Sequence, residues 1–148
     1  MNNANNININ NNTLNTAILP LAGRLLMALI FVFSAIGKIS APAATMGYIS
    51  AMGLPFPALG LAGAIGVELI GGLLLAFGYQ TRLVALGLAA FSVVTAVLFH
   101  GAIGDQNQLI HLLKNLAMAG GLLQIAAFGP GSLSLDARRG APQVLARI

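Results

Sequence analysis

Residues 64–78 have the sequence AIGVELIGGLLLAFG, and this stretch decides the class of fold. Fourteen of its fifteen residues are apolar or glycine, and the exception is Glu68. The stretch belongs to an apolar segment, 58–78, whose length matches the roughly 20 residues that a helix needs to cross the hydrocarbon layer. Its apolar residues do not alternate with polar ones, which argues against a half-buried strand. The segment therefore predicts a membrane-spanning helix with a carboxylate near its middle.

The composition of the whole chain supports a membrane protein. Of the 148 residues, 57% are hydrophobic and 7% are charged, whereas a soluble domain usually has about 25% charged residues. The mean hydropathy is +0.88. A fully buried helical subunit of a soluble complex is the alternative, but apolar segments of membrane-spanning length favour the bilayer. The lipid bilayer is therefore the first partner that we expect.

The residue types present exclude several classes of function. The chain has no cysteine, two histidines and three acidic residues. It can hold no disulfide, thiolate zinc site or CxxC redox centre, and we expect no metal site. The net charge is +4, but the seven basic residues are scattered along the chain. Such an excess is typical of membrane orientation, and we expect no nucleic-acid partner.

Four apolar segments organise the chain, and we place the helices at about 18–38, 58–78, 82–100 and 109–129. They form a four-transmembrane-helix domain, 18–129. We expect a disordered asparagine-rich tail at 1–17 and a cytoplasmic polar tail at 130–148. The first segment also has features of a signal peptide, because a basic residue precedes a short apolar run. Within the long loop 39–57, AATMGYISAM could form a short interfacial helix.

Two pairs of similar segments indicate an internal repeat. RLLMALIFVFS at 24–34 is similar to RLVALGLAAFS at 82–92, and GGLLLAFG at 71–78 is similar to GGLLQIAAFG at 120–129. Chance similarity between segments rich in the same few residues is the alternative. The matches occur in the same order, which favours a duplicated helix pair and a retained first helix. The predicted fold is all-α, an integral membrane antiparallel four-helix bundle built from two parallel two-helix repeats.

The distribution of basic residues predicts the orientation in the membrane. With four spans, both termini and the loop 79–82 lie on one side of the bilayer. That side has five basic residues, which are Arg24, Arg82, Arg138, Arg139 and Arg147, and the other side has Lys38 and Lys114. Because cytoplasmic loops carry the excess of lysine and arginine, both termini are expected in the cytoplasm.

Glu68 lies on a stripe of small residues at intervals of four along its helix. The other members of this stripe are Gly60, Ala64, Gly72 and Ala76. Small residues let helix backbones approach closely, so this face should pack against a neighbouring helix and point Glu68 into the bundle. Gly120 and Gly121 are expected to pack similarly in the last helix.

The remaining polar residues of the spans can face the same interior. From the rise of about 1.5 Å per residue, Glu68 lies near mid-membrane, within reach of long side chains from other helices. We predict a central polar site of Glu68, Lys114 and Arg24, and an outer mouth of His100, His111 and Lys38. Intramembrane ionisable residues are functional candidates, but a buried ion-pair network that only fixes helix register is the alternative. The two histidines are better explained as wet interfacial residues than as haem or metal ligands.

Several stretches together resemble the DoxX family of small four-helix bacterial inner-membrane proteins. They are RLLMALIFVFSAIGKI, YISAMGLPFP, ELIGGLLLAFGYQTRLVALGLAAFSVVTAVLFH, KNLAMAGGLL and GPGSLSLD. The resemblance covers about 18–136. The resemblance implies the bacterial cytoplasmic (inner) membrane as the location. The resemblance also implies that the polar positions of the family correspond here to Arg24, Lys38, Glu68, Arg82, His100 and Lys114.

The resemblance also implies a link to redox chemistry. Founding members of the family are associated with a thiosulfate:quinone oxidoreductase, and related proteins are described as partners of redox-defence enzymes. The hypothesis is a membrane subunit that supports a redox system and holds a quinone or a small polar ligand, with redox proteins or further copies of the chain as partners. No cofactor motif is visible, so a non-catalytic subunit is favoured over an enzyme acting alone. A small-solute transporter or channel, and a scaffold for a partner protein, are the alternatives.

Overall fold

The structure, a computed structural model, describes residues 14–140, and every element in that range is helical. A π-helical turn, η1 (Leu14–Ile18), leads directly into α2 (Leu19–Ser40). The following elements are α3 (Pro42–Ala51), α4 (Pro57–Phe77), α5 (Thr81–Phe99), α6 (Gln106–Phe128) and the short α7 (Leu135–Arg138). Four of these segments are long and apolar enough to cross a membrane. The prediction of an all-α integral membrane four-helix bundle is confirmed.

The ends of the predicted spans differ from the observed helices by a few residues. In α6 the helix begins three residues earlier than predicted, at Gln106, because Asp105 accepts a hydrogen bond from Gln108 N at 2.9 Å and caps the helix. At the N-terminus, the helical segment begins at Leu14, so the expectation of a disordered tail is wrong for residues 14–17. The rest of that predicted tail lies outside the described residues.

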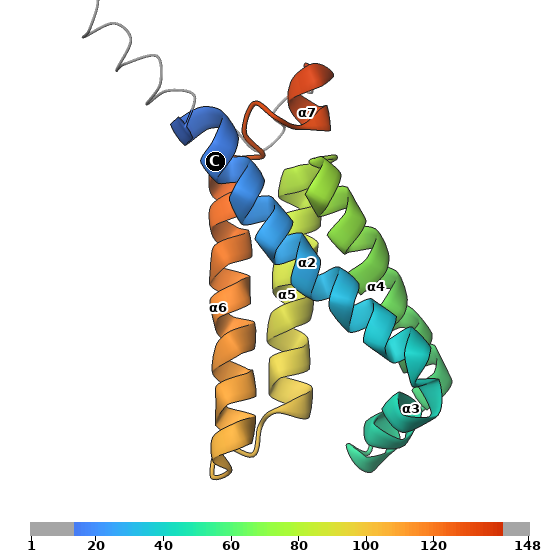
Figure 1. Cartoon of the computed structure of the whole chain (residues 1–148). Coiled ribbons are helices and arrows are strands. Elements are labelled where there is room, and N and C mark those ends of the chain that lie inside the picture. The colour runs from blue at the N-terminus through green and yellow to red at the C-terminus, as the bar shows by residue number, and fades with distance from the viewer. Residues whose placement is uncertain (1–13, 141–148) are drawn as a thin grey trace, which may run out of the picture.

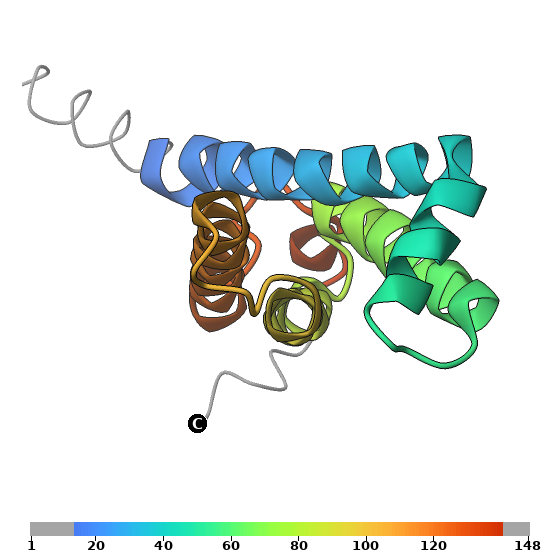
Figure 2. The ribbon, with the colours of Figure 1, turned by 90° about the horizontal axis from the view of Figure 1, so that it is seen from below.

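The four long helices form two antiparallel pairs, α2 with α4 and α5 with α6. Figure 1 shows the two pairs close together near α7 and diverging toward α3. Seen from below in Figure 2, α2 and α4 are inclined to α5 and α6. We call the two ends of the bundle the α7 end and the α3 end. The inclination of the pairs leaves room between them at the α3 end.

Small side chains dominate the buried core between the helices. The buried cluster consists of Ala28, Phe31, Leu75, Ala85, Leu88, Ala89, Ala119, Leu122 and Ala126. In lipid, no hydrophobic force drives helices together, so close backbone contact between small residues supplies much of the packing energy. Large apolar side chains point outward instead; Leu26 and Phe33 are each 70% exposed and Phe128 is 82% exposed. This arrangement suits a surface in contact with lipid.

The Gly71–Gly72 pair brings α4 against two neighbours. A Cβ atom at Gly72 would lie 3.0 Å from Val32 Cγ2 of α2, and one at Gly71 would lie 2.9 Å from Leu88 Cδ2 of α5. The other packing glycines differ in their surroundings. A Cβ at Gly60 would lie 3.6 Å from Ile49 of α3, and one at Gly121 would lie 3.4 Å from Met27 Cε.

Gly120 departs from the expectation. A Cβ there would meet nothing within 4 Å among the residues that the structure describes, and Gly120 is exposed. The packing role expected of Gly120 is therefore wrong, because this face of α6 points away from the other helices. Of the remaining stripe members, Ala76 packs against the core cluster and Ala64 is half-buried.

The segment after α6 is part of the fold. Asp136 accepts hydrogen bonds from the backbone N of Gln80 and of Thr81, each at 2.8 Å, and from Thr81 Oγ1 at 2.7 Å. These groups belong to the first turn of α5, whose free N–H groups need acceptors. Asp136 N in turn donates to Gly78 O at 2.9 Å. Within 130–140, the predicted polar tail thus forms a cap on α5, while 141–148 lie outside the described residues.

A pair of glycine substitutions tests the close contact of α2 with α4. We expect Gly72→Ala to lower the free energy of unfolding by about 1–3 kcal/mol, because the new methyl group must displace Val32. The melting temperature of the detergent-purified protein should fall accordingly. The matched control is Gly120→Ala, which adds the same group to α6 without a neighbouring atom. Thermal unfolding followed by circular dichroism compares the two. Equal melting temperatures for the two variants would contradict the packing described above.

Candidate functional site

Glu68 lies in the middle of α4 and is 6% exposed. Its carboxylate faces α2, where Lys38 Nζ donates to both oxygens, each at 2.9 Å. Ser34 Oγ donates to Glu68 Oε1 at 3.1 Å and accepts from Lys38 Nζ at 2.7 Å. Residues 34 and 38 are one helical turn apart, so both side chains reach the same point on α4. The carboxylate is therefore neutralised by one cation and hydrogen-bonded by two side chains.

The expected partners of Glu68 were Lys114 and Arg24, and the structure corrects this assignment. Lys38, which was expected at the outer mouth, is the counter-ion. Depth taken from residue spacing is correct only for upright helices with side chains level with their own backbone. The inclined α2 and the long, flexible lysine stem let Lys38 reach toward the middle of α4.

Arg24 has a different task at the α7 end. It is 1% exposed and donates from Nη1 to Leu75 O at 3.2 Å and to Ala76 O at 3.3 Å. Its Nη2 donates to Leu133 O, in the segment after α6, at 2.6 Å. The carbonyl groups of the last turn of a helix lack partners within that helix. Arg24 therefore closes the end of α4 and holds the segment that follows α6.

Arg82 does the same for the other helix pair. Its Nη1 donates to Ala126 O at 3.2 Å and to Ala127 O at 3.0 Å, in the last turn of α6. In each pair, an arginine near the start of the first helix thus binds carbonyl groups at the end of the second. This correspondence agrees with the internal repeat, which stays a prediction.

A cavity of about 1070 Å³ lies between the two helix pairs at the α3 end. Most of its walls are apolar, with Phe31, Ile49, Phe91, Leu98 and Met118 among the lining residues. Its charged and imidazole side chains are Lys38, Glu68, His100, His111 and Lys114. Five of the six predicted polar site residues therefore line one cavity, and Arg24 does not. A second cavity, of about 890 Å³, lies at the α7 end, and its one charged lining residue, Asp136, already caps α5.

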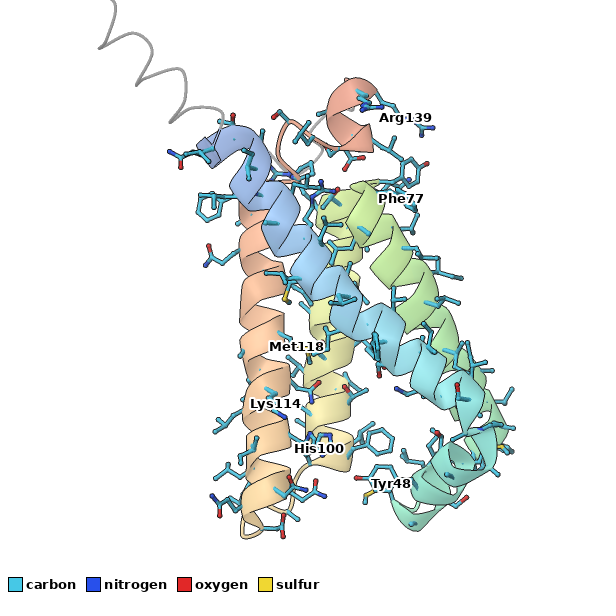
Figure 3. The ribbon with its side chains drawn as sticks, in the orientation of Figure 1. Tyr48, Phe77, His100, Lys114, Met118 and Arg139 are labelled. Carbon is cyan, nitrogen blue, oxygen red and sulfur yellow. The ribbon has the colours of Figure 1, made fainter. Side chains whose placement is uncertain are left out.

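The two histidines, His100 and His111, lie side by side in the lining of the larger cavity, at the α3 end. Their rings stack with centroids 5.0 Å apart, and His100 Nδ1 is hydrogen-bonded to Gln108 Oε1 at 2.8 Å. Tyr48 of α3 stacks on Phe99 with centroids 5.6 Å apart and donates to Phe99 O at 3.0 Å. Figure 3 shows Tyr48, His100 and Lys114 at the same end of the bundle. Within 14–140, no three potential metal ligands of the His, Cys, Asp or Glu type come together.

A double-mutant cycle tests the identity of the counter-ion. Lys38→Met should destabilise the protein by about 3 kcal/mol, because it leaves the buried Glu68 carboxylate without its cation. Adding Glu68→Gln should recover part of that loss, which gives a coupling energy of about 1 kcal/mol or more. The matched control, Lys114→Met with Glu68→Gln, should show additive effects. Unfolding in mixed detergent micelles measures each free energy, and coupling to Lys114 instead would overturn the pairing.

Comparisons with known proteins agree with this architecture. The sequence profile of the DoxX family matches residues 19–101. The chain is 40% identical over 116 residues to Inner membrane protein YqjF of Escherichia coli K12, which covers 78% of this chain and 88% of that protein. It is 31% identical over 128 residues to Inner membrane protein YphA of the same organism, which covers 82% of this chain and 90% of that protein. No solved structure matches the chain. The chain belongs to the DoxX family and is an integral inner-membrane protein.

Proposed function

We propose that the protein is a membrane subunit of a redox system and that its cavity holds a quinone. The observation that carries this proposal is the buried Lys38–Glu68 pair on the wall of a largely apolar cavity. Ligand pockets are commonly about 300–1,000 Å³, apolar, with a small number of polar groups that orient the ligand. The volume of about 1070 Å³ is just above the upper end of that range.

The residues fit the chemistry of such a ligand. A quinone needs apolar surroundings for its tail and polar groups for its ring oxygens, and it supplies two-electron, two-proton transfer when bound. Oε1 of Glu68 accepts from Lys38 and Ser34, whereas Oε2 accepts from Lys38 alone. A carboxylate has about four acceptor positions, so Oε2 can still accept a hydrogen bond or a proton from a ring hydroxyl of the reduced form, the quinol. Lys38 holds this carboxylate in place.

The chain needs a partner to act in redox chemistry. It has no cysteine, so it cannot pass electrons through a dithiol of its own. A subunit role is therefore better supported than an enzyme acting alone, and the resemblance to redox-associated DoxX proteins points the same way. A channel is less well supported, because Leu75, Leu88 and Leu122 are each at most 2% exposed and fill the interior between the pairs. Transport would require that packed layer to open.

Substitution of Glu68 tests the quinone proposal. We expect the wild-type protein, extracted from membranes in mild detergent, to carry quinone that mass spectrometry and absorbance detect. Glu68→Gln should lower that content about tenfold while the melting temperature changes by only a few degrees, because the amide keeps the shape but offers one acceptor oxygen fewer to a quinol hydroxyl. If Glu68→Gln retains the quinone and Glu68→Ala fails to fold, Glu68 is a structural residue and the proposal is wrong.

We also propose that the α7 end faces the cytoplasm. Among the described residues, this end has Arg24, Arg82, Arg138 and Arg139, whereas the α3 end has Lys38 and Lys114. The excess supports the orientation by the positive-inside rule.

Reporter fusions test the orientation. Green fluorescent protein fused after residue 140 should fluoresce, because it folds in the cytoplasm. Alkaline phosphatase inserted between α5 and α6, at 101–105, should be active, because it folds outside. The opposite pair of results would reverse the topology.

A further inference from the structure

Lys114 carries a charge that no side-chain carboxylate of the chain can balance. The chain has three acidic residues, and all of them lie within the described range. Glu68 is paired with Lys38, Asp105 caps α6 by accepting from Gln108 N, and Asp136 caps α5 through Thr81. Each carboxylate is therefore committed to another group. Within 14–140, Lys114 makes no hydrogen bond or ion pair.

Lys114 lies within a membrane-spanning helix, and its side chain is exposed rather than buried among other side chains, so its charge meets the cavity or the lipid. It lies eight residues after Gln106, the first residue of α6, which is about 12 Å along the helix axis. It lines the cavity together with Asn115 and with His111, one turn earlier on the same face. Ionisable groups at such depths normally pair with another charge, because an isolated ammonium is expensive to remove from water. Figure 3 shows Lys114 between the labelled Met118 and His100 along the bundle.

The charges on the cavity wall sum to one uncompensated cation. Lys38 and Glu68 neutralise each other through two contacts of 2.9 Å. Lys114 remains, with the imidazoles of His100 and His111 as additional polar neighbours on the same wall. The cavity is therefore complementary to a ligand with one negative charge.

We propose that this cavity binds an amphipathic ligand with a single oxyanion group, a carboxylate or a phosphate, that pairs with Lys114. The apolar part of the ligand lies against the apolar walls, among them Phe31, Phe91, Leu98 and Met118. A free inorganic anion fits less well, because it would leave most of the roughly 1070 Å³ and its apolar lining uncovered. This inference depends on Lys114 and not on the Lys38–Glu68 pair, but it concerns the same cavity, so the anionic ligand and a quinone would compete for it.

Fluorescence titration with a dansylated undecanoic acid, on the full-length protein in a mild non-ionic detergent, tests the role of Lys114. Lys114→Met should weaken binding about tenfold or more, whereas Lys114→Arg, which keeps the charge, should bind within about threefold of wild type. Arg139→Met is the charge-matched control. It also removes one positive charge, but Arg139 lies at the α7 end over the Tyr79 ring, at 4.9 Å. Its affinity should equal that of wild type.

Competition then identifies the part of the ligand that the cavity recognises. Dodecyl phosphate and laurate should both displace the probe at micromolar concentration, while inorganic phosphate should fail at millimolar concentration. Displacement by inorganic phosphate as effective as by dodecyl phosphate would overturn the requirement for an apolar part. If Lys114→Met binds the probe as tightly as wild type, the pairing itself is overturned. If the Lys114→Met variant does not fold, Lys114→Gln is used in its place.

The two proposals fail in different ways. Glu68→Gln should lose quinone but still bind the dansylated acid, because Lys114 is intact. Lys114→Met should lose the dansylated acid, and its quinone content reports separately on the Lys38–Glu68 site. Loss of the dansylated acid in the double variant Lys38→Met with Glu68→Gln, but not in Lys114→Met, would assign the charge recognition to Lys38 and overturn the inference.

Discussion

The structure depends on one constraint, which is that hydrocarbon supplies no hydrogen bonds. Every polar group that enters the bilayer needs a partner inside the protein, and most polar side chains of the bundle satisfy this need. Arg24 and Arg82 bind the carbonyl groups at the ends of α4 and α6. Asp136 binds the N–H groups at the start of α5, and Lys38 neutralises Glu68. These contacts join segments far apart in the sequence, so they fix the fold as well as satisfy the polar atoms.

The positions of these contacts explain the shape of the bundle. At the α7 end, Arg24 ties α2 to the last turn of α4 and to Leu133, and Asp136 ties the segment after α6 to α5. Packing between Gly72 and α2 continues this close contact toward the middle of the membrane. At the α3 end, Tyr48 of α3 links the pairs through an exposed hydrogen bond to Phe99 O and through ring stacking on Phe99. The pairs can therefore diverge there, and the cavity lies in the space between them.

Much of this architecture follows from the sequence, because length and hydropathy determine where a helix can cross a bilayer. The spans, the short helix in the 39–57 loop and the inward direction of Glu68 were predicted in this way. The partner of Glu68 was not predicted correctly, since residue spacing gives the depth of a residue along an upright helix but not the tilt of α2. Asp136 was missed because its contact with Thr81 joins residues 55 apart, and a lone aspartate in a polar segment has no local pattern. Gly120 was misassigned because the glycine pair alone does not show which face of α6 meets a neighbour.

The cavity contains two kinds of charge with different consequences. The Lys38–Glu68 pair is complete within the chain, so it can orient a neutral ligand or exchange a proton without requiring an ion. Lys114 has no carboxylate counter-ion within the chain, because all three acidic residues have other partners. A lysine kept at this depth without a counter-ion makes the empty cavity unfavourable relative to one that holds an anion. The same side chain would then favour the ligand-bound form of the bundle, since binding stabilises whichever state the ligand prefers. Binding of the proposed anionic ligand would therefore be coupled through Lys114 to the stability of the diverging α3 end.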